Sequence, residues 1–296
     1  MPSLKELRGR ITGVKSTRKI TNAMKMVAAS KLRRAQIRAE AARPYAETSK
    51  RMMGELASTV QGADVSSLPR LMVGTGKDQT HLLIVMTSDR GLAGGFNANL
   101  VRKTRQYISE LQEQGKTVKL LPVGRKGAEV LARYYPEAIV ETMTSDGGQG
   151  ASFEQAISIA SHVVKLLDQG EIDCCTLLRN RFVNAMTQVP EQFKLVPLPA
   201  SEEQAQGSAS GEAHYEFEPN EETLLAQLLP RNLEVQLFAA LLESAAGEHA
   251  ARMTAMDNAS RNASKAIDSL SLKYNRTRQA NITNELIEII SGAEAV

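Results

Sequence analysis

The sequence predicts an α/β fold in which the two ends of the chain form a long antiparallel coiled coil and an α/β domain is inserted between them. Three observations lead to this prediction. Both terminal segments favour long helices and repeat small or apolar residues at 3,4 spacing. The middle of the chain alternates strand-like and helix-like segments. Only 4% of the 296 residues are aromatic and tryptophan is absent, which favours packing through small aliphatic side chains.

The N-terminal segment, residues 1–60, is expected to form a long helix. Ser3 and Glu6 have the spacing of a capping box. An ordinary two-helix coiled coil would lose stability with Arg18 and Lys25 on its seam. The 3,4 seam is apolar at its start, polar in its middle and small afterwards: Leu4, Leu7, Ile11, Val14, Arg18, Thr21, Lys25, Ala28, Leu32 and Ala35.

The central segment, residues 75–200, is expected to be a Rossmann-like α/β domain. Its first strand is a near-continuous apolar run, which is typical of a buried parallel strand. The strands are expected at 81–89, 117–124, 138–145, 174–182 and 187–198, and the helices at 98–114, after Arg125, and at 152–170. Strands that alternate with helices indicate a sheet covered by helices.

Residues 201–219 are polar and rich in Ser, Gly, Glu and Gln, so we expect a surface loop, with one short edge strand at 214–218. The last segment, residues 220–296, is expected to be helical from about 221 to 290, and Pro230 is expected to kink or restart it. From Val235 to Ile287 its 3,4 seam is unbroken and includes small residues such as Ala259, Ala263 and Ala266, which indicates close helix approach.

Length decides how these parts combine. About 60 helical residues make a rod of roughly 90 Å, which is longer than a domain of this size is wide. The two terminal helices are therefore expected to extend out of the α/β domain and to pair with each other.

The composition excludes several classes of protein. No run of about 18 apolar residues is present, so a transmembrane segment is not expected. The N-terminus has no apolar signal region. Cys174 and Cys175 are adjacent, and neighbouring residues of a strand point to opposite faces, so we expect reduced core thiols and not a disulfide. The four histidines have no metal-binding spacing along the chain, so neither a metal nor a cofactor is expected.

A glycine-rich turn, SDRGLAGGFN at 88–97, lies between a predicted strand and a predicted helix, as phosphate-binding loops do. It matches neither standard nucleotide-binding motif and has no lysine placed for a phosphate. A tight structural turn is therefore favoured. A small nucleotide-binding enzyme is kept as one rival interpretation.

The first 60 residues contain fourteen Lys and Arg against four Glu. This excess indicates an anionic partner, either nucleic acid or acidic protein loops. Nucleic-acid-binding surfaces usually add aromatic side chains, and this segment has only Tyr45, so acidic protein surfaces are favoured. A self-sufficient coiled-coil protein that binds nucleic acid or acts as a scaffold remains the second rival.

The C-terminal end shows the opposite pattern. Its apolar residues occupy more than one side of the helix, so another molecule is expected to enclose them. This predicted apolar bearing consists of Ile282, Leu286, Ile287, Ile289 and Ile290.

Several segments resemble one family closely. ITNAMKMVAASKLRRAQ, ARPYAE, TSDRGLAGGFN, HAARMTAMDNAS and YNRTRQANITNELIEIISGA are similar, in order and spacing, to the bacterial type of gamma subunit of the F-type ATP synthase. The resemblance implies a central-stalk rotor shaft without a catalytic site of its own. It implies a hexameric ring of alpha and beta subunits, an epsilon subunit and a c-ring as partners, with an inhibitory subunit as a further one. It also implies a peripheral membrane protein on the cytoplasmic side of the bacterial inner membrane.

The resemblance assigns coupling roles to individual positions. Met24 matches a position that faces a beta-subunit loop. The C-terminal positions associated with coupling to beta are Arg252, Arg278, Gln279, Thr283 and Glu285. Five residues are added from their charge alone, as contacts for acidic loops of other subunits: Arg10, Lys19, Lys25, Arg33 and Arg34.

Overall fold

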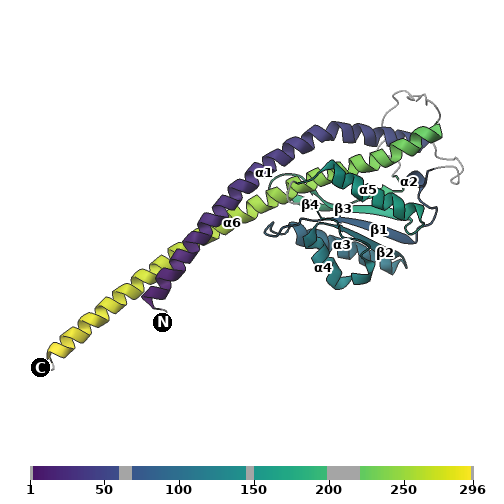
Figure 1. Ribbon diagram of the computed structural model, residues 1–296. Helices are drawn as coiled ribbons and strands as arrows, with labels where there is room; N and C mark the ends of the chain where they lie inside the picture. Colours follow the sequence, from purple (N-terminus) through teal and green to yellow (C-terminus); the bar gives the residue numbers. More distant parts are fainter. Residues whose placement is uncertain (1–2, 60–68, 145–149, 199–220, 295–296) are drawn as a thin grey trace. The chain divides into compact units, whose positions relative to one another are not determined.

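The computed structural model describes residues 3–59, 69–144, 150–198 and 221–294. Along the chain, the long helix α1 precedes a four-stranded sheet and its shorter helices, and the long helix α6 follows them (Figure 1). The elements in chain order are α1 (Leu4–Thr59), α2 (Arg70–Val73), β1 (Thr80–Met86), α3 (Phe96–Glu113), β2 (Thr117–Val123), α4 (Arg125–Tyr134), the 3-10 helix η2 (Pro136–Ala138), α5 (Phe153–Asp168), β3 (Cys174–Phe182), β4 (Gln188–Val196) and α6 (Glu221–Glu294).

The chain divides into two compact units. One consists of Met1–Ala29 and Arg252–Val296, and the other of Ser30–Ala251. Both long helices pass from one unit into the other, so this division does not test the predicted domain boundaries, which stay predictions. We call the first the helix-pair unit and the second the sheet unit.

The sheet has the strand order β2-β1-β3-β4. β1 pairs in parallel with both β2 and β3, and β4 pairs with β3 in antiparallel fashion. The fully parallel core explains why β1 is apolar at successive positions, because helices cover both of its faces. The predicted mixed α/β architecture is confirmed.

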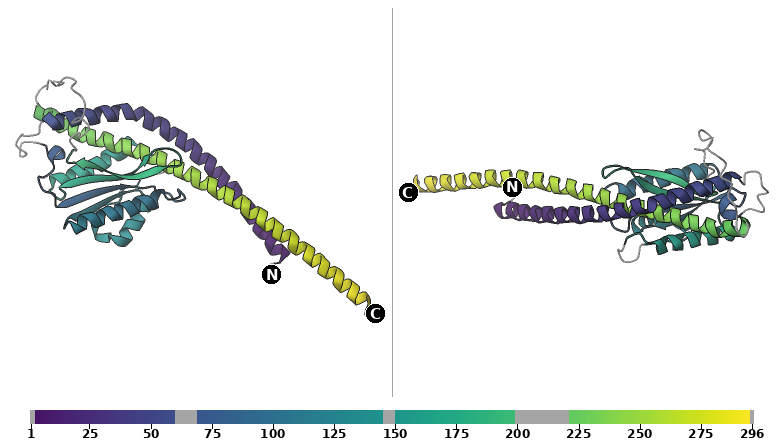
Figure 2. Two further views of the ribbon diagram at one scale, coloured as in Figure 1. Left: turned by 180° about the vertical axis from the view of Figure 1, so that it is seen from behind. Right: turned by 90° about the horizontal axis from the view of Figure 1, so that it is seen from above.

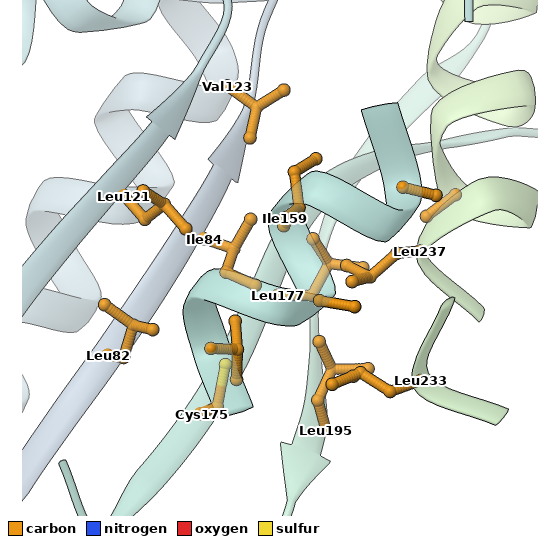
Figure 3. Packing of buried hydrophobic residues seen from close by; sticks show 14 of the residues in the cluster. Leu82, Ile84, Leu121, Val123, Ile159, Cys175, Leu177, Leu195, Leu233 and Leu237 are labelled. Carbon is orange, nitrogen blue, oxygen red and sulfur yellow. The ribbon is translucent and has the colours of Figure 1, made fainter. Parts of the chain in front are cut away.

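Alternating residues of the strands build two separate cores. On one face, Leu82, Ile84 and Leu177 pack with α5 and with Leu233 and Leu237 of α6 (Figure 3). On the other face, residues such as Leu83, Val85 and Leu178 pack with α3 and α4. The N-terminal part of α6 is therefore an integral helix of the sheet unit.

The predicted strand at 138–145 is wrong. Within the described part of this segment, residues 138–144, only Ile139 and Met143 bridge to β2, each in isolation, and the backbone between them makes no continuous ladder. Pro230 also neither ends nor restarts a helix, because α6 runs through it. The expected edge strand at 214–218 lies outside the described residues.

The cysteines behave as expected. Both are buried and free. Cys175 faces the core shown in Figure 3, whereas Cys174, the preceding residue of the same strand, faces the opposite side. Burial raises the pKa of Cys174 to about 11 and also raises the pKa of Cys175. Among the helices of the described ranges, none is long and apolar enough to cross a bilayer.

Candidate functional site

The helix-pair unit contains most of the sequence-predicted site residues. Three side-chain contacts define how its helices meet: Lys25 Nζ donates to Asp257 Oδ1 at 2.7 Å, the hydroxyls of Thr21 and Ser260 lie 2.7 Å apart, and Arg18 Nη1 reaches Ser264 Oγ at 3.5 Å. Across these three pairs the residue number falls along α1 while it rises along α6, so the two helices are antiparallel. Figures 1 and 2 show this pairing from three directions.

These contacts explain the polar middle of the predicted α1 seam. Each polar residue of α1 meets a polar or acidic residue of α6, which reduces the cost of placing Lys25 and Thr21 between two helices. Asp257 also pairs with Arg261, one turn further on, at 2.7 Å. The hydrogen bond from Lys25, with support from Arg261, holds the pKa of Asp257 below its ordinary value.

Apolar and small side chains lie on both sides of this polar stretch. Leu7 and Ala28 of α1 are buried, and so are Met256, Ala263 and Ile267 of α6. Alanine at such positions permits close approach of the two helix axes. The few apolar residues of the α1 seam are therefore sufficient for pairing, because α6 supplies buried apolar partners for them, including the small Ala263.

The end of α6 is different, because it extends past the start of α1 (Figure 1). Every described side chain from Arg278 onward is exposed. This free end is roughly 25 Å long at 1.5 Å per residue. Its large apolar side chains are 49–68% exposed: Ile282, Leu286, Ile287, Ile289 and Ile290.

The predicted C-terminal coupling residues share this free end with the apolar set. Residues three and four apart form rows along a helix. One row contains Arg278, Ile282, Glu285 and Ile289, so charged and apolar side chains alternate along it. The Thr283 hydroxyl donates to the Gln279 carbonyl at 3.0 Å. Gln279 and Thr283 occupy the neighbouring row, and their side chains are exposed.

The other predicted site residues have different surroundings. Met24 and Arg252 are half-buried in the helix-pair unit. Lys25 is engaged by Asp257, so its charge has a role inside the coil. Arg33 and Arg34 belong to the sheet unit, where both are exposed and Arg34 reaches Ser30 Oγ at 3.4 Å.

Sequence reasoning missed Asp257 as the partner of Lys25. Asp257 lies beside the 3,4 seam of α6, which passes through Met256, so the periodicity alone did not select it. A basic residue on a seam requires an acidic one opposite it, and this requirement is the signal that could have identified Asp257.

The glycine-rich turn is packed and internally bonded. Ala93 and Phe96 form a small core with Ala251 of α6, and Gly247 leaves room for the Phe96 ring, because a Cβ there would lie 3.2 Å from Phe96 Cε2. The two ends of the turn are also hydrogen-bonded to each other. Asn97 Nδ2 donates to Ser88 Oγ at 2.7 Å, and Asn97 Oδ1 accepts from Ser88 N at 3.0 Å. These contacts favour a structural turn over a phosphate site.

Comparison with known proteins agrees with this arrangement. A family model described as ATP synthase matches residues 3–296. The chain is 68% identical to the ATP synthase gamma chain of Gluconobacter oxydans and 60% identical to that of Gluconacetobacter diazotrophicus, with all of each chain covered.

Solved structures show the same fold. A chain from the central stalk and c-ring of the Tetrahymena thermophila mitochondrial ATP synthase is 32% identical, with a TM-score of 0.63 over 81% of this chain and 99% of that one. A chain of the Euglena gracilis enzyme is 21% identical, with a TM-score of 0.68 over 99% of this chain and 94% of that one. The chain therefore belongs to the ATP synthase gamma chain family.

Proposed function

We propose that this chain is the rotor shaft in the central stalk of a proton-translocating F-type ATP synthase. It couples proton-driven rotation of the c-ring to conformational change at the catalytic beta subunits, and so to ATP synthesis and hydrolysis. The observation that carries this proposal is the free end of α6, which presents apolar and charged side chains together on a rod without cover from α1.

Each part of the free end has a role in this proposal. The apolar bearing fits inside a hydrophobic sleeve formed by the hexameric ring of alpha and beta subunits. Arg278 and Gln279 hydrogen-bond an acidic loop of a beta subunit, because a guanidinium pairs strongly with carboxylates. Met24, Arg252, Thr283 and Glu285 add further contacts with beta.

The mechanism requires that the shaft interacts differently with different conformations of the same subunit. A ligand shifts a conformational equilibrium only by the difference between its interaction energies with the two states. The rows of α6 differ from one another in charge and apolar character, so each beta subunit meets a different surface as the rod turns. Rotation then changes which conformation is favoured at each site.

Membership of the family supports the remaining proposed partners. The epsilon subunit and the c-ring bind the chain at its sheet unit, and an inhibitory subunit is a further partner. The chain itself is a peripheral protein on the cytoplasmic side of the bacterial inner membrane. It carries no catalytic site, nucleotide cofactor or nucleic-acid partner.

Co-purification tests the assignment. The chain, tagged at its sheet unit, is expressed with the alpha and beta subunits, and we expect a complex in which ATP hydrolysis depends on the tagged chain. Absence of both subunits from the purified complex would contradict the proposal. The rival enzyme is tested separately, because stoichiometric binding of labelled nucleotide to the chain alone would favour a nucleotide site.

A further inference from the structure

A cluster of three potential metal ligands lies at the amino ends of the parallel strands, in the sheet unit. It consists of Asp78, His81 and Cys174, whose ligand atoms all lie within 4.8 Å of one another. Asp78 lies two residues before β1, His81 is the second residue of β1, and Cys174 is the first residue of β3. The helix-pair surface described above contains none of these residues.

Strand register brings the histidine and the cysteine together. His81 and Cys174 are direct partners in the parallel pairing of β1 with β3. Partners in adjacent strands point to the same face of a sheet, so both side chains face the side covered by α3 and α4. They are 93 positions apart in the sequence, which is why spacing along the chain does not reveal them.

The distances between the ligand atoms resemble those of a metal site. Asp78 Oδ1 lies 2.9 Å from His81 Nε2 and accepts a hydrogen bond from Cys174 Sγ at 3.3 Å. Oxygen, nitrogen and sulfur ligands arranged tetrahedrally at zinc are roughly 3.3–3.5 Å apart. Small side-chain rotations would therefore place all three atoms around one ion.

The histidine provides independent support for a ligand. Its side chain is only 9% exposed, yet among the described residues neither ring nitrogen has a partner in hydrogen-bond geometry. The close Asp78 oxygen does not meet that geometry. A buried imidazole without hydrogen bonds is costly, and a metal ion at Nε2 would satisfy one of its nitrogens.

We propose that Asp78 Oδ1, His81 Nε2 and Cys174 Sγ bind one Zn²⁺ ion. The thiol loses its proton to solvent as the sulfur–zinc bond forms, so the bound site consists of one thiolate, one carboxylate and one neutral imidazole. This mixed set of sulfur, nitrogen and oxygen donors suits zinc, whereas magnesium and calcium prefer oxygen alone.

The surroundings define the rest of the site. The Asp78 side chain is 62% exposed, so a water molecule has access to the fourth position. Lys116 Nζ lies 2.6 Å from Asp78 Oδ2 and also donates to the Asp78 carbonyl, so it competes electrostatically with a cation. Asp173 does not serve as a ligand, because Thr75, Gln79 and Thr80 all donate to its carboxylate.

Cobalt and zinc titrations of the purified full-length chain test the proposal. Co²⁺ bound to a thiolate produces a near-ultraviolet charge-transfer band, which we expect at one equivalent and which Zn²⁺ should abolish by displacement.

Asp78→Asn and Cys174→Ser are each expected to weaken Zn²⁺ binding about tenfold or more, since changes around metal ligands cost 10–100-fold. Cys174→Ser should also lose the band. Cys175→Ala, on the opposite face of the same strand, is the matched control and should keep it.

Lys116→Gln gives a prediction of opposite sign. In this variant the Lys116 ammonium group no longer competes with the metal ion for the Asp78 carboxylate. The variant should therefore bind Zn²⁺ several-fold more tightly than the unmodified chain does. If the cluster is only an internal ion pair, Lys116→Gln leaves metal binding unchanged. The proposal is overturned if the unmodified chain shows no stoichiometric Co²⁺ band, or if Cys174→Ser binds Zn²⁺ as tightly.

Discussion

The ammonium group of Lys25 lies 2.7 Å from the carboxylate of Asp257, across the interface between two helices from opposite ends of the chain. The pair lies in the middle of the seam, where apolar residues would otherwise be expected. It therefore fixes the relative register of the helices at a point where hydrophobic contacts alone would permit sliding, as a polar seam position does in coiled coils.

Reversing this ion pair should show its role. Lys25→Asp or Asp257→Lys alone places two like charges together and should weaken protection of amide hydrogens in α1 residues 4–29. The double exchange restores opposite charges and should recover most of the protection. Hydrogen exchange of the isolated chain measures this effect. Arg33→Asp, at an exposed position, is the control and should leave protection unaltered; equal loss in the control would contradict the assignment.

The same substitution should change the stability of the chain much more at one isoleucine of α6 than at another. Ile267 is 8% exposed and Ile287 is 55% exposed. Ile267→Ala should lower the free energy of unfolding by about 2 kcal/mol, because it leaves a cavity between the helices. Ile287→Ala should change it by less than about 0.5 kcal/mol. Denaturant unfolding of the chain measures both. In the assembled complex, Ile287→Ala should lower the rate of ATP turnover more than Ile267→Ala does. An unchanged turnover rate with Ile287→Asp would argue against the apolar bearing.

The Arg278→Ala, Gln279→Ala double variant tests the coupling residues. Both side chains are exposed, so the isolated chain should unfold as before. A hydrogen bond to a charged group contributes about 1.5–3 kcal/mol, so ATP-driven or proton-driven turnover of the complex should fall about tenfold or more. Assembly should survive, because the apolar bearing is intact. Full turnover in a correctly assembled complex would exclude these two residues from coupling.

Glycine-to-alanine changes at two sites should have opposite signs. Gly124 has φ +105°, and a Cβ there would clash with the Thr87 carbonyl group, so Gly124→Ala should destabilise the sheet unit by at least about 2 kcal/mol. Gly13 lies within α1, and apart from its chain neighbours and the adjacent backbone of the same helix, no heavy atom lies within 4 Å of the position that an alanine methyl group would occupy. Gly13→Ala should therefore stabilise that helix by about 0.5–1 kcal/mol. Thermal unfolding followed by circular dichroism distinguishes the two.

Asp173 should make stability depend on pH. Burial opposes its ionisation, but hydrogen bonds from the Thr75 hydroxyl and the Thr80 and Gln79 amides outweigh this and lower its pKa. Its stabilising contribution is therefore complete above the unfolded value of about 3.9 and is lost as pH falls through the folded pKa.

The Asp173→Asn variant measures this contribution. Its Tm should lie below that of the unmodified chain by a constant amount between about pH 5 and 7, and the difference should shrink below about pH 4. A Tm difference that stays constant down to the lowest measurable pH would show that ionisation of Asp173 is not involved.

Periodicity predicted the paired helices well, because burial in a two-helix unit follows the 3,4 pattern directly. Leu7, Thr21 and Ala28 of the predicted seam are all buried. The first parallel strand, β1, was also recognisable, because burial on both faces requires a near-continuous apolar run. The segment at 138–145 has similar composition but forms only isolated bridges to β2, and this depends on tertiary packing that composition does not contain.

Features that depend on register were harder to find. The Lys25–Asp257 pair joins residues 232 positions apart, and His81 meets Cys174 only through strand pairing. The predicted coupling residues are a separate case. The structure shows that those on the free end of α6 are exposed, but their roles depend on partners, so the assignment rests on family resemblance and stays a prediction.

The free end of α6 has a consequence for the life of the subunit before assembly. A newly made copy displays Ile282, Leu286, Ile287, Ile289 and Ile290 to water on a short stretch of helix. Contiguous apolar surface of this kind promotes self-association and capture by chaperones. Surplus copies should therefore aggregate or be degraded, and under the proposed function the cell must match synthesis of this chain to the supply of the alpha and beta subunits proposed to enclose it.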